Sequence, residues 1–139
     1  MAAVKFNNFV QNLGRGVMDL NSDTLKVMLT NTAPSASNSV KGDLTEIAAG
    51  NGYTAGGTAI GTTAYSQTAG VATLSGNDVT FTASGGSIGP FRYAVVYDDT
   101  PTSPADPLIA YQDYGSAITL AAGGTFTVDF PSSVILTVT

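Results

Sequence analysis

The sequence predicts an all-β domain, either a two-sheet β-sandwich or a small barrel, and we favour the sandwich. Apolar runs alternate with turn residues about every eight to twelve positions, which gives about eight short strands. No convincing helical pattern follows residue 20. Charged residues make up only 11% of the chain, so Thr, Ser, Asn and Gly must cover the surface, and these residues suit strands and turns.

The opening segment, residues 1–20, is the part without a strand pattern. Phe6, Phe9 and Leu13 follow helical spacing, whereas two glycines and three asparagines weaken a helix. Both a short helix and an extended arm therefore stay open. We expect this apolar segment to pack either on the β-sandwich domain, residues 21–139, or on a neighbouring molecule.

Period-two alternation marks the strands that follow. In DTLKVMLTN, Leu25, Val27 and Leu29 share one face. FRYAVVYDD, residues 91–99, has apolar residues on both faces, which predicts a central strand.

The residues from Gly70 to the carboxyl end are predicted to form the remaining strands. GVATLSGNDVTFTASGG is predicted to be a hairpin whose first strand ends at Leu74 and whose second strand contains Val79 and Phe81. Four further strands are predicted in PLIAYQDYG, SAITLAAGG, TFTVDF and SVILTVT, which Gly and Pro residues separate.

Composition narrows the function classes. The net charge of −5 and five scattered basic residues argue against a nucleic-acid partner. The chain has no histidine and no cysteine, so the common nucleophile systems and most zinc sites are excluded. Neither a signal-peptide core nor a membrane-spanning run is present. We therefore expect a non-enzymatic protein with no catalytic residue, cofactor or metal, assembled in the cytoplasm without a membrane partner.

The glycine-rich stretch EIAAGNGYTAGGTAIG, residues 46–61, raises the question of a phosphate site. Gly50, Gly52 and Gly56 give the wrong spacing for a dinucleotide fingerprint, no lysine lies nearby, and no helical pattern follows. We interpret these glycines as positions of positive φ in a long loop between strands.

Two further chemistries stay open as alternatives. A carboxylate pair could serve a glycosidase, with candidates Asp98, Asp99, Asp106, Asp113 and Asp129, of which Asp98 and Asp113 are the first pair to test. The loop YDDTPTSPAD could hold calcium, but it matches no EF-hand spacing. In both cases, loop carboxylates that form turns or contact solvent are the simpler interpretation.

Carbohydrate binding is the third alternative, because exposed aromatic rings on a β-sandwich can stack on sugars. The chain has no tryptophan, so a platform would have to come from tyrosines. The candidates are Tyr53, Tyr65, Tyr111 and Tyr114.

Four stretches resemble a known family. SDTLKVMLTNTAPSASN, LTEIAAGNGYTAGGT, FTASGGSIGPFRYAVVYDDT and PLIAYQDYGSAITLAAGGTFTVDF are similar to the cement, or capsid decoration, proteins of tailed phages and prophages, those of podoviruses in particular. The resemblance extends from about Phe6 to Val138. These motifs indicate family membership and carry no catalytic residue with them.

The resemblance implies a jelly-roll β-sandwich that sits on the outside of the phage head. Its partners would be a major capsid protein of HK97-like fold and a second copy of itself, as a homodimer or another symmetric oligomer. It would fasten neighbouring capsomers together. The residues that we expect to make capsid or oligomer contacts are Phe6, Phe9, Arg15, Gly52, Tyr53, Gly56 and Gly57.

Overall fold

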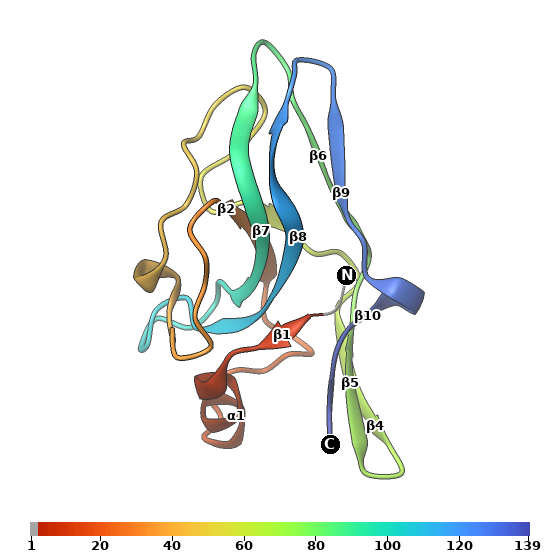
Figure 1. Ribbon diagram of the computed structural model, residues 1–139. Coiled ribbons are helices and arrows are strands. Elements are labelled where there is room, and N and C mark those ends of the chain that lie inside the picture. Colours follow the sequence, from red (N-terminus) through yellow and green to blue (C-terminus); the bar gives the residue numbers. More distant parts are fainter. Residues whose placement is uncertain (1–2) are drawn as a thin grey trace.

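The computed structural model describes residues 3–139 as an antiparallel β-sandwich with one short helix (Figure 1). This confirms the predicted fold class, an antiparallel β-sandwich of the jelly-roll-like kind, although its two layers are built from three sheets and not two. The described chain forms ten strands, against about eight predicted. Two of the ten, β1 and β3, are only two residues long, too short for any alternation to show in the sequence.

The first layer is a five-stranded sheet in the order β1-β8-β7-β2-β3. Its strands are β1 (Val4–Lys5), β8 (Leu108–Leu120), β7 (Ile88–Asp98), β2 (Leu25–Thr30) and β3 (Thr58–Ala59). The predicted central strand is confirmed, because β7 lies between β8 and β2. Both of its faces are buried over Tyr93 to Asp98.

The second layer consists of two smaller sheets on one side of the first (Figure 1). One contains β10 (Val134–Val138), β5 (Val71–Ser75) and β4 (Ala64–Thr68), and the other contains β6 (Val79–Thr82) and β9 (Thr125–Val128). Two short 3-10 turns, η1 (Lys41–Asp43) and η2 (Pro131–Ser133), lie in the connections.

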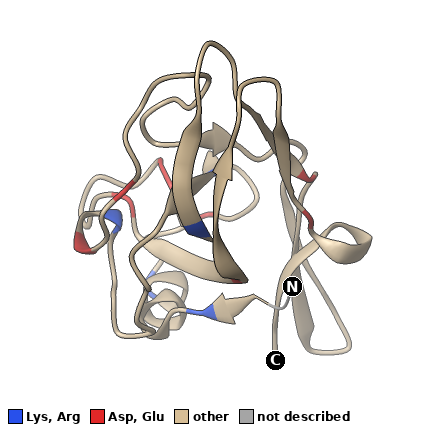
Figure 2. Cartoon of the chain, turned by 45° about the horizontal axis from the view of Figure 1, so that its top comes forward, with Lys and Arg blue, Asp and Glu red and all other residues tan. Residues whose placement is uncertain are grey.

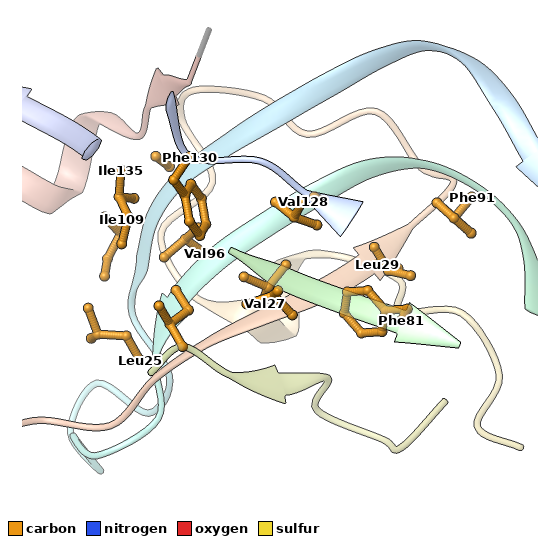
Figure 3. Close-up of a cluster of buried hydrophobic side chains, with 14 of the residues drawn as sticks. Leu25, Val27, Leu29, Phe81, Phe91, Val96, Ile109, Val128, Phe130 and Ile135 are labelled. Atoms are coloured by element: carbon orange, nitrogen blue, oxygen red, sulfur yellow. The ribbon is translucent and has the colours of Figure 1, made fainter. Parts of the chain in front are cut away.

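The main core fills the space between the layers. Leu25, Val27 and Leu29 alternate inward from β2, as predicted, and meet Phe81 and Val128 from the second layer (Figure 3). All five side chains are nearly or fully buried. Each contributes roughly 1.5–3 kcal/mol of hydrophobic stabilisation, so this alternation is a main determinant of the fold.

The opposite face of the five-stranded sheet is also covered. Met28, Val95, Tyr97 and Leu108 form a second apolar cluster there, which Phe6 completes. Phe6 therefore attaches the amino-terminal segment to the outer face of the sheet.

Of the two conformations left open for the amino-terminal segment, a helix forms. Helix α1 (Asn7–Gly14) follows β1, and Gly16 ends this region with a φ of +73°. Phe9 points into the main core with no exposed surface. The segment thus packs on its own domain through Phe6 and Phe9.

The predicted hairpin over residues 70–86 is wrong. Strand β5 pairs with β4 and β10, whereas β6 pairs with β9. Ala69 and Gly70, both with positive φ, form a two-residue turn between β4 and β5, and such turns match the twist of paired strands. Gly76 instead packs against Ile60 and Ile135, where the chain moves from one small sheet to the other.

The prediction of two separate strands in PLIAYQDYG and SAITLAAGG is also wrong. Their residues Leu108–Leu120 form the single strand β8, and Gly115 continues it with a φ of +98°. Glycine tolerates this conformation within an extended strand, so here it marks an irregularity and not an end.

Candidate functional site

Residues 3–139 enclose no pocket, and within them no three Asp, Glu, His or Cys side chains converge as a metal site. The same part of the chain has no apolar helix of the length that crosses a membrane. The features that remain to be weighed are the glycine-rich segment, the acidic residues, the tyrosines and the surface of the smaller sheets.

The glycine-rich segment, residues 46–61, runs along the edge of β2 that faces away from β7. The backbone N–H of Ile47 donates to the Leu29 carbonyl at 3.1 Å, and that of Ile60 donates to the Leu25 carbonyl at 2.8 Å. Between these contacts, β3 pairs with Lys26 and Val27. The segment therefore covers an edge that would otherwise expose unpaired backbone groups.

Hydrogen bonds of Tyr53 and Glu46 fix the middle of the glycine-rich segment to β2. The backbone N–H of Leu29 donates to the Tyr53 hydroxyl at 3.0 Å, and that hydroxyl donates to Glu46 Oε1 at 2.7 Å. The Gly56 N–H donates to the same carboxylate oxygen at 2.6 Å. Burial, more than any other cause, raises the pKa of Tyr53 far above its usual range, so its hydroxyl stays a donor.

Four of the five glycines of this segment have the positive φ values that the sequence predicted, from +82° at Gly57 to +126° at Gly50, and Gly61 does not. Asn51 and Gly52, at +56° and +98°, form a tight turn in which Gly50 and Tyr53 exchange both backbone hydrogen bonds. An Asn-Gly pair favours this type I′ turn, a signal that strand periodicity alone misses. A Cβ at Gly57 would lie 1.8 Å from the Val27 carbonyl oxygen, so its role is close approach to β2.

The predicted contact residues fall into buried and accessible groups. Phe6 and Phe9 are 0% exposed and Tyr53 is 2% exposed, so all three side chains stabilise the domain itself. Arg15 and Gly52 are exposed. A contact role for the seven residues stays a prediction, which only the accessible ones can fulfil without unfolding.

Tyr97 contacts two of the predicted contact residues, Phe6 and Gly56. The Tyr97 hydroxyl donates to the Gly56 carbonyl at 2.5 Å, and its ring packs in the cluster that contains Phe6. Lys41 lies over the same ring at 5.9 Å from its centroid and pairs with Glu46 Oε2 at 3.4 Å. The amino-terminal segment and the glycine-rich segment thus contact the same central strand.

The two aspartates that were the first pair to test do not meet. Asp113 pairs with Arg92 at 2.8 Å, and this guanidinium lowers the pKa of its carboxyl group. Asp98 lies at the far end of β7, buried beside Asp23. Burial, followed by the hydrogen bond with Asp23, raises the pKa of Asp98 to about 8.

The tyrosines do not gather into one platform. Tyr53 is buried, and Tyr65 and Tyr111 are half-buried. Tyr114, at 48% exposed, is the most accessible of the four, and its ring packs edge-on against Phe126 at a centroid distance of 5.5 Å.

The outer face of the β4-β5-β10 sheet carries no charged residue. No Asp, Glu, Lys or Arg occurs between Glu46 and Asp78 or after Asp129. The residues of this uncharged face are Ala64, Ser66, Thr68, Val71, Thr73, Ser75, Val134 and Thr137. In Figure 2 the β4-β5 hairpin carries neither blue nor red, whereas both colours occur on the five-stranded sheet and its loops.

No protein-family model, curated protein or solved structure matches this chain. Of the features described above, the uncharged face shares one property with the cores of protein interfaces, which are depleted of charge.

Proposed function

We propose that this protein is a structural, non-enzymatic component of a phage virion that binds the outside of an icosahedral shell and cements neighbouring capsomers. Its partners are a major capsid protein of HK97-like fold and a second copy of this chain. Two observations support the proposal: the sequence resemblance to cement proteins and the uncharged face of the β4-β5-β10 sheet.

The uncharged face carries the structural part of the proposal. Its side chains are small, and several are hydroxyls, so a flat partner surface can approach closely and exchange hydrogen bonds. Binding there would bury no lysine or glutamate, so it would avoid the high cost of desolvating charge. Many copies bound by symmetry would stabilise the assembled shell by mass action and avidity.

The test is co-sedimentation of the purified protein with expanded shells from which the cement protein has been removed. Ser66→Lys places a charge in the middle of the uncharged face, at an exposed position. Thr102→Lys, in the exposed loop after β7, is the matched control. We expect saturable binding by the wild type and by Thr102→Lys, and a loss of at least about tenfold in affinity for Ser66→Lys, because the partner would have to desolvate the new charge.

Equal binding by all three proteins would remove the uncharged face from the proposal and leave shell binding intact. Failure of the wild type to bind any form of the shell would overturn the proposal itself. Circular dichroism checks that both variants are folded.

A carbohydrate-binding virion or tail-fibre module is the second candidate, and the exposed ring of Tyr114 is the observation that favours it. Sugars stack on such rings. A glycan array with the wild type and Tyr114→Ala tests it. Binding that the substitution abolishes would favour this module, and an array without any signal would dismiss it.

A further inference from the structure

Asp98, the last residue of β7, is a carboxyl group buried without a full set of partners. Its side chain is 0% exposed. Oδ1 accepts a hydrogen bond from the Thr100 N–H at 3.1 Å, whereas Oδ2 has no partner among residues 3–139. Asp23 lies in the turn before β2, which adjoins the end of β7, because Leu25 pairs with Asp98 and the Asp99 N–H donates to the Thr24 carbonyl. Burial, followed by the carboxyl group of Asp23, raises the pKa of Asp98. A neighbouring like charge disfavours ionisation of a buried carboxyl group, so a proton or a cation beside Asp98 would stabilise the pair.

The charged groups around this pair do not neutralise it. Lys26, on β2, pairs with Asp99 at 3.0 Å, and Lys41 pairs with Glu46. The charge of Asp99 adds to the repulsion that Asp98 experiences. Asp106, which also faces Asp99, has a pKa raised chiefly by its own burial, against the opposing effect of Lys41. The surroundings therefore favour a pair that binds one proton over a pair with both carboxyl groups ionised.

The space available at Asp98 indicates whether a proton or a metal ion neutralises the charge there. Calcium takes six to eight oxygen ligands at about 2.3–2.6 Å. Within residues 3–139 there is no pocket at Asp98 and no group of three acidic side chains placed to hold a metal. A proton needs no additional space and no further ligands.

We infer that Asp23 and Asp98 share one proton near neutral pH and form a proton latch, which joins the turn before β2 to the end of β7 and opens when the proton is lost. Two hydrogen bonds beside the pair make the same connection. The Asp99 N–H donates to the Thr24 carbonyl at 2.9 Å, and the Thr24 N–H donates to Thr100 Oγ1 at 2.9 Å. This inference does not depend on the proposed binding to a phage shell.

The direction of the pH effect follows from the two states of Asp98. In the unfolded chain its carboxyl group titrates near its ordinary pKa of about 3.9, whereas in the folded protein it titrates far higher. The folded state therefore binds the proton more tightly. The stabilisation is complete below about pH 4 and is lost as the pH rises through about 8, the folded pKa.

The experiment is thermal unfolding from pH 5 to pH 9 of the wild type, Asp98→Asn and the control Asp129→Asn. The amide introduced by Asp98→Asn cannot ionise, and it can still donate to Asp23. We expect the wild-type Tm to fall by roughly 5–10 °C between pH 6 and pH 9. The same fall is expected for Asp129→Asn, whose substituted residue is exposed, and no comparable fall for Asp98→Asn.

A measurement on the wild type alone covers the case in which Asp98→Asn does not fold. Carbon-13 NMR of the aspartate carboxyl groups should give one group with a midpoint above pH 6. Hydrogen exchange of the Thr24 and Asp99 amides should accelerate above that midpoint by more than base catalysis explains. The Tyr53 amide, in its own turn, is the internal control.

Three results would overturn the proton latch. The first is a wild-type Tm that does not change between pH 6 and pH 9. The second is an NMR titration in which every aspartate has a midpoint below pH 5. The third is a rise in Tm on adding calcium chloride at pH 8 that Asp98→Asn abolishes, since a cation and not a proton would then hold the pair.

Discussion

The edges of β2 and β4 differ in whether another segment of the chain covers them. The edge of β2 is covered by the glycine-rich segment, with backbone bonds at Leu25 and Leu29 and the Tyr53 hydroxyl between them. Strand β4 ends the three-stranded sheet and has no neighbour beyond it among the described residues except Asn21, whose Oδ1 accepts from the Tyr65 N–H at 3.3 Å.

The covered edge of β2 therefore contributes to the stability of the fold, whereas the open edge of β4 belongs to the accessible surface. At β2, specific hydrogen bonds and close backbone approach close the sheet, so substitutions there should be costly. At β4, an edge of five residues is short enough to stay open without a cover, and its neutral side chains are available for contact. The proposed binding surface includes β4 and not the glycine-rich segment for this reason.

The largest effect is expected at Gly57. In Gly57→Ala the new Cβ would lie 1.8 Å from the Val27 carbonyl oxygen at a φ of +82°, so the cover must leave β2. We expect the free energy of unfolding to fall by about 3 kcal/mol or more in urea denaturation. Gly70→Ala, at nearly the same φ but with no atom within 4 Å, should cost only about 1 kcal/mol. Equal losses in the two variants would show that β2 is not tightly covered.

Removal of one hydroxyl group should have the next largest effect. Tyr53→Phe leaves the buried Leu29 N–H without its acceptor and removes one of the donors to Glu46, at an expected cost of about 1–3 kcal/mol. Tyr65→Phe, on β4, is the matched control, and its free energy of unfolding should change by less than about 0.5 kcal/mol. A stable Tyr53→Phe protein would contradict the assigned role of this hydroxyl.

A smaller loss is expected for Glu46→Gln. The amide oxygen can still accept from Tyr53 and Gly56, so the main change is the loss of the partly buried ion pair with Lys41. We expect a cost of about 1 kcal/mol or less by thermal unfolding, reduced further in high salt. A loss as large as that of Tyr53→Phe would mean that the charge, and not the acceptor oxygen, holds the segment.

The smallest effect is expected on β4. Gln67→Lys puts a charge on the open edge at an exposed position, and the free energy of unfolding of the monomer should change by less than about 0.5 kcal/mol. Sedimentation velocity of wild type and variant checks the edge at the same time. A large loss of stability would show that this edge is covered in solution, which would remove the contrast with β2.

Local patterns predicted much of the strand content of this fold. Alternating side chains such as Leu25, Val27 and Leu29 must face one way in an extended chain, whatever their partners are. Apolar residues on both faces of residues 91–99 likewise required a strand covered on both sides. The positive φ values at Gly52 and Gly57 were predicted because glycine alone adopts them at low cost.

The alternation of apolar and polar residues did not predict which strands pair with each other. Strands β5 and β6 are neighbours in sequence, yet β5 pairs with β4 and β6 pairs with β9. Alternation says which face a residue takes, but the partner depends on turns and on packing between the two layers. The same holds for the candidate site: the absence of charge between Glu46 and Asp78 is visible in the sequence, whereas the collection of these neutral residues on one face needs the register of β4, β5 and β10.

By itself the sequence determined an all-β domain with little charge, glycine-rich turns and an apolar amino-terminal segment, because these follow from local sterics and side-chain chemistry. The tertiary structure alone decided that Phe6 and Phe9 are buried in their own domain, that the glycine-rich segment covers the edge of β2, and that Asp98 is buried where the turn before β2 adjoins the end of β7. Each of these is a contact between distant parts of the chain, and its energy depends on which layers face one another.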